Sequence, residues 1–236
     1  MSELDFSGRL AVVTGATRGL GYAVAVELAR RGAHVIAIGR KPAALEALDD
    51  DARQAGGEAM TLVPINLTDG PGIDRLGAAI AERWGKLDVL VGCAAVLGSV
   101  SPLAHMKAKT FAEVMDVNAS ANWRLIRTLH PVLRASDAGR VAMVTCAAAR
   151  EKRPNWGTYA ASKRALEALT EAYAREVDET PIRANLFDPG IMGTGLRALA
   201  APGDVLKNLT QPRDVAPKLL RLCHPSFDAS GTLTAY

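Results

Sequence analysis

The stretch Thr14-Gly15-Ala16-Thr17-Arg18-Gly19-Leu20-Gly21 follows the apolar run Leu10–Thr14 and opens the helix-periodic segment Leu20–Arg31. Glycines let a backbone turn sharply and approach a ligand closely. A helix N-terminus offers free N–H groups and the positive end of its dipole to a phosphate. A glycine pattern alone is a weak indication, but one between a buried strand and a helix is typical of dinucleotide sites. We therefore expect a pyrophosphate at this turn; the alternative is a tight turn without a ligand.

The rest of the chain repeats the order of strand, then helix. Further apolar runs of strand length are Val35–Gly39, Met60–Asn66, Leu87–Cys93, Val141–Cys146 and Arg183–Phe187. Segments of helical period between them are Ala43–Ala55, Ile73–Trp84, Phe111–Arg134 and Tyr159–Glu176. Almost continuously apolar strands indicate a parallel sheet covered on both faces, and the alternation implies right-handed crossovers. The sequence predicts one α/β domain over residues 1–236: a doubly wound parallel sheet of the Rossmann type, in three layers.

The alternation of strand-like and helical segments is interrupted after the sixth apolar run. Gly190–Asn208 contains several glycines and Pro202, and we expect it to be a mobile insertion that forms a lid over the substrate. Gln211–Leu222 has the pattern of one more helix, and Gly231–Ala235 that of a short seventh strand.

Composition excludes several classes of protein. The chain has 236 residues, 49% hydrophobic and 22% charged, with a net charge of +3. Its basic residues are dispersed, which gives no support to nucleic-acid binding, and its apolar runs are too short for a membrane span. The three cysteines are an odd number without metal-ligand spacing, so we expect no disulfide framework, no metal and a reducing cytoplasm. Ser2–Gly8 carries Glu3 and Asp5, which argues against a secretory leader.

The choice of nicotinamide cofactor should be made after the second strand, in Ile38-Gly39-Arg40-Lys41. An acidic residue there would bind the ribose 2′-hydroxyl of NAD, but this chain has Gly39 followed by two cations. Guanidinium groups hold phosphates bidentately, so Arg40 and Arg18 are expected to bind a 2′-phosphate. NADP(H) is favoured over NAD(H); the alternative is that Arg40 and Lys41 are simply solvated.

Tyr159 and Lys163 open one helical segment four residues apart, which places both side chains on one face. A free tyrosine has a pKa of about 10 and is a poor acid–base at neutral pH. A nearby ammonium stabilises the phenolate and lowers that pKa. We therefore expect Tyr159 to act as a general acid toward a developing alkoxide, or as a base in the reverse direction. The pair is common by itself and gains meaning from the phosphate turn far upstream.

With these motifs the chain resembles the short-chain dehydrogenase/reductase family, in its NADP-preferring branch. The matching pieces are Thr14-Gly15 with Gly19-Leu20-Gly21, Asn66-Leu67, Asp116-Val117-Asn118, Tyr159 with Lys163, and Pro189-Gly190 with Thr194. The resemblance implies that Tyr159 is the acid–base and that Lys163 binds the nicotinamide ribose.

The resemblance also implies other roles. Asn118 would hold a water in the proton relay, and Asn66 and Leu67 would lie at the adenine. Cofactor contacts would further come from Gly15, Thr17, Gly21, Ala94, Pro189, Gly190, Ile191 and Thr194. Family members are often homodimers or homotetramers, built partly through the two long helices. Taken alone, Asn118 and Asn66 would read as ordinary polar residues of a helix and a strand end.

Two segments depart from the family pattern. Where the family has a serine that hydrogen-bonds the substrate carbonyl, this chain has Cys146, next to Thr145. A thiol is a weaker donor than a hydroxyl, so Cys146 performs this role poorly, Thr145 replaces it, or carbonyl positioning is lost. After the fourth strand, Gly92-Cys93-Ala94-Ala95 stands where the family has Asn-Asn-Ala-Gly, so we expect the backbone path to survive without the asparagine contacts. Asp188, before Pro189, has no explanation at this stage.

The sequence therefore favours an NADP-dependent enzyme that interconverts a carbonyl and an alcohol, with Tyr159, Lys163, Asn118 and Cys146 in the catalytic site. The alternative is a protein that binds a dinucleotide as a sensor or scaffold with little or no turnover. The expected partner is a small carbonyl or alcohol substrate, with no nucleic acid or membrane. We expect Leu97–Met106, Ala147–Trp156 and Gly190–Asn208 to form the substrate pocket. The cations of 150–153 could meet an acidic substrate tail or be solvated.

Overall fold

Seven parallel strands form one sheet in the computed structural model, which describes residues 4–236. The strands are β1 (Leu10–Thr14), β2 (His34–Gly39), β3 (Thr61–Pro64), β4 (Val89–Gly92), β5 (Arg140–Val144), β6 (Arg183–Asp188) and β7 (Leu233–Ala235). Their order across the sheet is β3-β2-β1-β4-β5-β6-β7. The chain therefore winds outward in both directions from the β1–β4 pair, which confirms the doubly wound parallel sheet.

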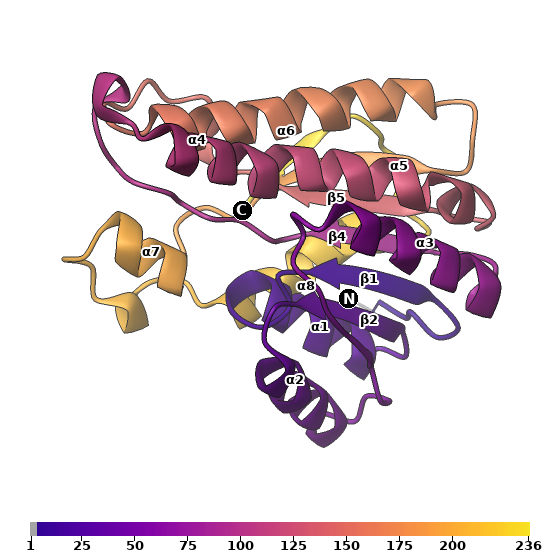
Figure 1. The fold of residues 1–236 in the computed structure, drawn as a ribbon. Helices are drawn as coiled ribbons and strands as arrows, with labels where there is room; N and C mark the ends of the chain where they lie inside the picture. The colour runs from indigo at the N-terminus through magenta and orange to yellow at the C-terminus, as the bar shows by residue number, and fades with distance from the viewer. Residues whose placement is uncertain (1–3) are drawn as a thin grey trace.

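Helices cover both faces of this sheet (Figure 1). One face carries α1 (Gly19–Arg30), α2 (Pro42–Gln54) and α8 (Pro212–Cys223); the other carries α3 (Gly70–Trp84), α4 (Ala108–Met115), α5 (Ala121–Arg134) and α6 (Gly157–Glu176). Each face has its own apolar core, because side chains of the buried strands alternate between the two helical layers. Single-domain, three-layer architecture follows from these two cores on one sheet.

Three expected strands, β3, β4 and β5, are shorter than their apolar runs, and β5 ends at Val144 rather than Cys146. β4 ends at Gly92 because the next two backbone N–H groups, of Cys93 and Ala94, bond to the hydroxyl of Thr14 at 3.1 and 3.2 Å instead of a neighbouring strand. β3 ends at Pro64, and the N–H of the next residue, Ile65, makes a last bond to the Gly39 carbonyl of β2 at 2.9 Å. Thr14 thus joins the carboxyl ends of β1 and β4 beneath the cleft described below.

The long helix expected over Phe111–Arg134 is interrupted. It begins earlier, as α4, and passes through a π-helical segment (Asp116–Ser120) before continuing as α5. Single π turns occur frequently at functional sites, and this one contains Asn118. The periodicity of apolar residues does not detect the one extra residue per turn.

The segment after β6 stands apart from the three layers (Figure 1). Residues 190–208, expected as an irregular insertion, include the short helix α7 (Gly195–Ala200) and a 3₁₀ turn at Leu206–Asn208. Thr194 caps α7 by accepting a hydrogen bond from the N–H of Arg197 at 3.2 Å. The expected final helix and short seventh strand are present as α8 and β7.

Candidate active site

The site lies where the winding of the sheet reverses, at the carboxyl ends of β1 and β4. Gly15 passes directly over Ala94 there: a Cβ on Gly15 would lie 2.8 Å from the Ala94 Cα, and its φ is +65°. Only glycine fits both demands. In open α/β sheets ligands bind at this reversal point, so the glycine turn and the segment after β4 form the floor of a binding cleft. The backbone path after β4 survives, as expected.

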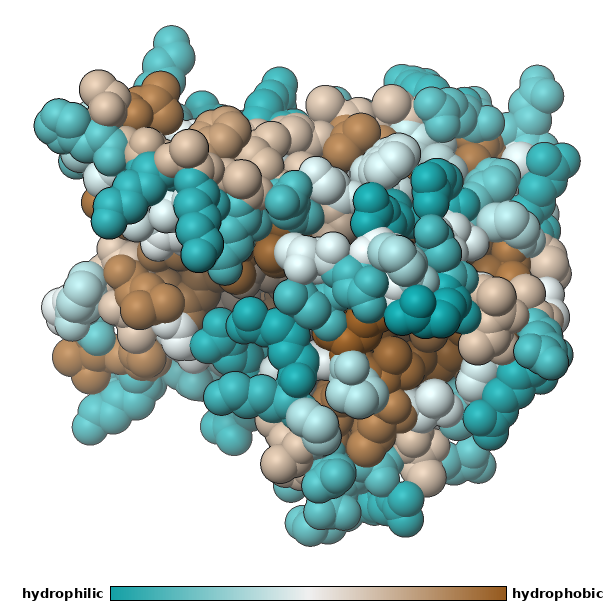
Figure 2. Space-filling model, in the orientation of Figure 1, coloured by the Kyte–Doolittle hydropathy of each residue, from teal (hydrophilic) through white to brown (hydrophobic). Residues whose placement is uncertain are grey.

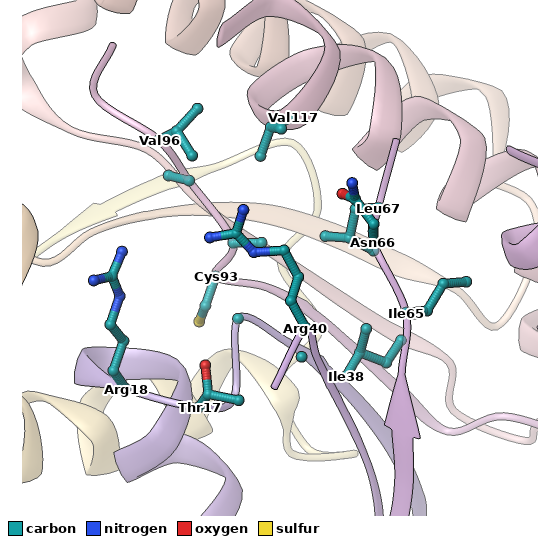
Figure 3. Close-up of a pocket in the computed structure, with 14 residues that line it drawn as sticks. Thr17, Arg18, Ile38, Arg40, Ile65, Asn66, Leu67, Cys93, Val96 and Val117 are labelled. Atoms are coloured by element: carbon teal, nitrogen blue, oxygen red, sulfur yellow. The ribbon is translucent and has the colours of Figure 1, made fainter. Parts of the chain in front are cut away.

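One part of the cleft is a cavity of about 130 Å³ beside the glycine turn. Figure 3 shows Arg18 and Arg40 extending toward it, with Asn66 and Leu67 on the far side. Among the described residues that line it are two cations and no acid. Gly39 stands where an acid would bind the ribose of NAD, and a Cβ there would lie 2.3 Å from the Thr17 Cγ2. The residues that line this cavity therefore suit a nucleotide that carries a 2′-phosphate on its ribose.

The first turn of α1 tests whether a dinucleotide fits. Its N-cap residue, Arg18, makes no side-chain capping bond, and the first turn contains no acidic residue. The free N–H groups of this helix end are therefore available to an external acceptor, and Arg18 adds positive charge. Gly21 serves packing, because a Cβ on it would lie 2.5 Å from the carbonyl oxygen of Gly15. These residues fit a pyrophosphate, the group that the sequence predicted here.

A second cavity, of about 290 Å³, continues from the first, since Cys93 and Ala95 line both. Its lining combines the glycine turn (Gly19, Leu20), the β5 end (Thr145, Cys146), α6 (Tyr159, Lys163) and the segment after β6 (Pro189, Gly190, Ile191, Thr194). Gly19, Cys146, Gly190, Ile191 and Thr194 are at least partly accessible, whereas the others in this set are buried. The structure thus brings the phosphate turn and the Tyr159–Lys163 pair to one cleft.

Tyr159 is buried at the inner wall of this second cavity. Burial raises its pKa well above the ordinary value, and the neighbouring Cys146 side chain, its hydrogen-bond partner, and the Asp188 carboxylate raise it further. This direction is opposite to the lowering that we expected from Lys163. The reason is burial of the phenol, which is the largest cause of the shift; the Lys163 ammonium, which donates to the carbonyl of Val144 at 2.7 Å, does not offset it. The phenol accordingly keeps its proton at neutral pH.

Asn118 lies behind this wall, fully buried, and does not line either cavity. Its carboxamide accepts from the N–H of Val96 and donates to the Val96 carbonyl, both at 2.9 Å, and also donates to the Ser162 hydroxyl at 3.0 Å. The Ser162 hydroxyl in turn donates to the carbonyl of Tyr159 at 2.7 Å. Asn118 therefore fixes the segment after β4 against the turn of α6 that carries Tyr159.

Hydrogen bonding distinguishes Thr145 from Cys146 as the residue that could replace the family's serine. The Thr145 hydroxyl is buried and donates to the Glu167 carboxylate at 2.7 Å, so it is not free for a substrate. Cys146 is partly exposed, lines the cavity and lies beside the Tyr159 hydroxyl. Of the two side chains, Cys146 holds the position from which a donor would reach a carbonyl oxygen.

Arg150, expected to meet an acidic substrate tail or to be solvated, and Asp188, which the sequence left unexplained, form an ionic network with the buried Glu167 next to Cys146. The Arg150 guanidinium bonds to both Glu167 and Asp188, whose side chains are almost completely buried. Asp188 also accepts from the N–H of Gly190 at 3.1 Å, and Glu167 from Arg164 at 2.8 Å. The network joins the β5 end, α6 and the start of the 190–208 segment. No signal in the sequence pairs these residues, because they meet only in the folded chain.

The substrate pocket differs in two respects from the expected one. Leu97–Met106, expected to form one wall, contributes no lining residue, although Leu97 packs against Tyr159 in a small buried cluster. Arg150 points inward to its carboxylates rather than into the cavity. Ala147–Trp156 and 190–208 contribute lining residues.

Within residues 4–236, no helix is both long and apolar enough to span a bilayer. The same residues contain no group of three or more His, Cys, Asp or Glu side chains placed to hold a metal ion.

The family model for short chain dehydrogenase matches residues 9–203. The uncharacterized oxidoreductase YciK of Escherichia coli K12 is 33% identical over 216 residues, covering 91% of this chain and 85% of that protein. An uncharacterized NAD-dependent oxidoreductase of Mycobacterium tuberculosis is 35% identical over 195 residues, covering 77% and 70%. A solved short chain dehydrogenase of Escherichia coli CFT073, complexed with NADPH, superposes with a TM-score of 0.95 at 31% identity, covering 100% and 99%.

Proposed function

The chain belongs to the short chain dehydrogenase family and is an oxidoreductase of that family; on this premise we propose that it is an NADP-dependent reductase that converts a ketone or aldehyde to an alcohol. One observation carries the proposal. Gly19 and Leu20 of the phosphate turn line the same cavity as Tyr159 and Lys163. A dinucleotide whose pyrophosphate lies on α1 can therefore extend its nicotinamide toward the phenol.

The preference for NADP rests on this chain's own residues, because its relatives use both nicotinamide cofactors: one is described as NAD-dependent and another was solved with NADPH. Arg18 and Arg40 both line the nucleotide cavity, and a side chain at Gly39, the position of a ribose-binding acid, would require Thr17 to move. We assign Arg18 and Arg40 to the 2′-phosphate, and Asn66 and Leu67 to the adenine.

When bound, the reduced nicotinamide supplies the hydride, and the protein supplies the proton and the orientation. Cys146 positions the carbonyl oxygen, and Tyr159 donates its proton to that oxygen as negative charge develops. Because burial raises the pKa of Tyr159, the phenol is protonated at neutral pH, which suits reduction. In the oxidation direction the same group must first lose its proton, so that reaction should require alkaline pH.

Lys163 and Asn118 act behind the phenol. Lys163 has further N–H groups besides the one that donates to Val144, and these can hold the nicotinamide ribose. Asn118 cannot offer its carboxamide to a water, since both ends of it are occupied. Its backbone carbonyl, which accepts from Asn122 at 2.9 Å, has a second lone pair for the relay water that the family resemblance implies.

The test is consumption of NADPH across a panel of ketones and aldehydes, beside Tyr159→Phe and direct titration of NADPH and NADH. Turnover that the wild type shows and Tyr159→Phe loses by about 100-fold or more supports the reductase. NADPH binding without turnover on the whole panel would instead favour a dinucleotide-binding sensor or scaffold, the function to which Cys146 in place of serine points.

We also propose that the protein acts as a homodimer or homotetramer through α4, α5 and α6. Two large hydrophobic side chains on these helices, Phe111 and Trp123, are each more than two-fifths exposed. Sedimentation velocity on the wild type and on Trp123→Glu tests this: a monomer in the wild type would refute it.

A further inference from the structure

The wall around Tyr159 is apolar. A small buried cluster of Leu97, Ala148 and Tyr159 is extended by the partly buried Cys146, Trp156, Leu196 and Ala200. The Trp156 ring meets the Tyr159 ring edge-on, with centroids 6.1 Å apart and planes at 72°. Asn155 holds this turn in a left-handed conformation, with φ of +69°, which asparagine tolerates better than most residues. Trp156 and two residues of α7, Leu196 and Ala200, thus line the space next to the phenol.

The charged side chains that line this cavity already have partners within the protein. Arg153 pairs with Glu151 and lies over the Trp156 ring, 5.7 Å from its centroid. Arg197 bonds to Asp204 at 2.5 Å.

Of the two innermost charged side chains, Asp188 has a cation as its partner, and Lys163 is assigned to the nicotinamide ribose. Lys163 donates to the Val144 carbonyl at 2.7 Å, and Asp188 pairs with Arg150. A charged substrate group would therefore lose its water without gaining a free counter-ion, which is unfavourable.

The remaining space lies toward the segment after β6. Part of the cavity of about 290 Å³ belongs to the nicotinamide, since Gly19 and Pro189 also line it. The rest is bounded by Ile191 and Leu196, and Ile191 remains 54% exposed. Figure 2 shows hydrophobic surface gathered over α7 and beside it. Apolar surface that rims a cleft in this way marks a ligand-binding groove.

Resting on the proposed reductase function, we propose that the substrate is an uncharged carbonyl compound whose bulky apolar group packs between Trp156 and Leu196 of α7. The carbonyl end lies at Cys146 and Tyr159, and the apolar group extends toward Ile191. Arg153 and Arg197 take no part in binding an acidic tail, because the charge of each is balanced by a neighbouring carboxylate, that of Glu151 and Asp204.

Three ketones with NADPH test the substrate class: 4-phenylbutan-2-one, the same compound with a para-carboxylate on the ring, and butan-2-one. A hydrophobic pocket discriminates by roughly 10-fold or more for each apolar group that it recognises. We expect kcat/KM for 4-phenylbutan-2-one to exceed that of both other ketones by at least about 10-fold. An equal or higher value for the carboxylate, or for butan-2-one, would overturn the proposal.

Alanine variants at two positions of α7 test where the apolar group of the substrate binds. Leu196→Ala should lower kcat/KM for 4-phenylbutan-2-one by about 10-fold, through KM, and leave that for butan-2-one within about twofold. Leu199→Ala is the matched control, since Leu199 is 67% exposed and does not line the cavity. Equal losses in the two variants, or equal losses for both ketones, would contradict the placement.

Ketone binding measured without turnover distinguishes a failure of the apolar site from a failure of the reductase activity. Calorimetry with the same ketones on Tyr159→Phe loaded with NADPH reports on the cavity without turnover. If no ketone is reduced but the uncharged aromatic one binds at least about 10-fold more tightly than its carboxylate, the reductase fails and the apolar site stands. If ketones are reduced but the carboxylate binds as well or better, the apolar site fails and the reductase stands.

Discussion

Replacing Arg150 with methionine leaves two buried carboxylates without their shared partner. The side chains of Glu167 and Asp188 are 1% and 6% exposed, and Arg150 bonds to both. Methionine keeps the length of the apolar stem but removes the charge and every donor. The variant therefore isolates the ionic contribution of Arg150 to the segment between β5 and α6.

The size of the effect follows from what each carboxylate retains. Removing one partner of a buried ion pair costs about 3–5 kcal/mol. The loss here should be smaller, because Arg150 is one-third exposed and Glu167 still accepts from Arg164 and Thr145. We expect the free energy of unfolding to fall by about 2 kcal/mol, which lowers Tm by roughly 4–8 °C for a chain of this size.

The assay is urea and thermal unfolding of wild type, Arg150→Met and Arg153→Met at pH 5 and pH 8. Arg153→Met is the control, because its pair with Glu151 is nearly half exposed on both sides and should contribute less than about 1 kcal/mol. Protonation removes the unpartnered charge, so the loss in Arg150→Met should be smaller at pH 5 than at pH 8. Equal, small losses in both variants, or a loss of stability that is larger at pH 5 than at pH 8, would refute the buried network as a source of stability.

The same variant should change the pH dependence of alcohol oxidation. The Asp188 charge raises the pKa of Tyr159, as a smaller cause than burial and Cys146. Arg150→Met leaves that charge unpaired, so the increase of the oxidation rate with pH should move to higher pH.

The remaining predictions concern cofactor, catalysis and stability. Arg40→Ala should weaken NADPH binding by about 10-fold or more and leave NADH unchanged, as titration of both would show. Cys146→Ser should raise kcat by about 10-fold, since a hydroxyl donates more strongly than a thiol to a developing oxyanion. Gly15→Ala should abolish dinucleotide binding, because the new Cβ meets Ala94 at 2.8 Å in a left-handed backbone. Asp88→Asn should lose about 2 kcal/mol of stability at pH 7: burial raises the pKa of Asp88, but hydrogen bonds and two basic side chains outweigh it and lower the pKa below its usual value. That contribution exists above the unfolded pKa of about 3.9 and disappears as pH falls through the folded value, so acid unfolding curves of the two proteins should converge.

Matched variants limit these predictions. Lys41→Ala should not change the ratio of the affinities for NADPH and NADH. An equal loss of affinity for NADPH and NADH in Arg40→Ala would show that Arg40 does not bind the 2′-phosphate. Gly203→Ala should be silent in binding, because a Cβ there meets nothing within 4 Å. A loss of kcat in Cys146→Ser would mean that the thiol suits its substrate. A constant difference between Asp88→Asn and wild type down to pH 2 would contradict the ionic explanation.

Sequence patterns predicted the parts of the site that depend on local structure. The glycine turn works through backbone conformation, and Tyr159 and Lys163 share a helical face at any position in a fold. Runs of buried apolar residues predicted the strands, with errors at their ends. At β4 the error arose because a side chain, that of Thr14, replaced the neighbouring strand as acceptor.

The rest of the site depends on contacts between segments that lie far apart in the sequence. Arg150 reaches Asp188 only because β5 and β6 are neighbours in the sheet, so the pairing is invisible in the sequence. The same holds for Thr145, which remained a candidate donor until its bond to Glu167 was seen. The pKa of Tyr159 also had the opposite direction to the expected one, because burial cannot be judged from the spacing of two residues.

The π turn between α4 and α5 carries one surplus residue. This residue determines how far α4 is rotated about its axis relative to α5. Each residue of an α-helix advances this rotation by about 100°. Deleting one residue from Asp116–Ser120 would restore regular winding but rotate α4 by that angle about its axis. Its buried Val114 would then turn away from the core, and Asn118 would lose the register that lets it bond both polar groups of Val96. The helix pair should therefore reject any insertion or deletion at this turn.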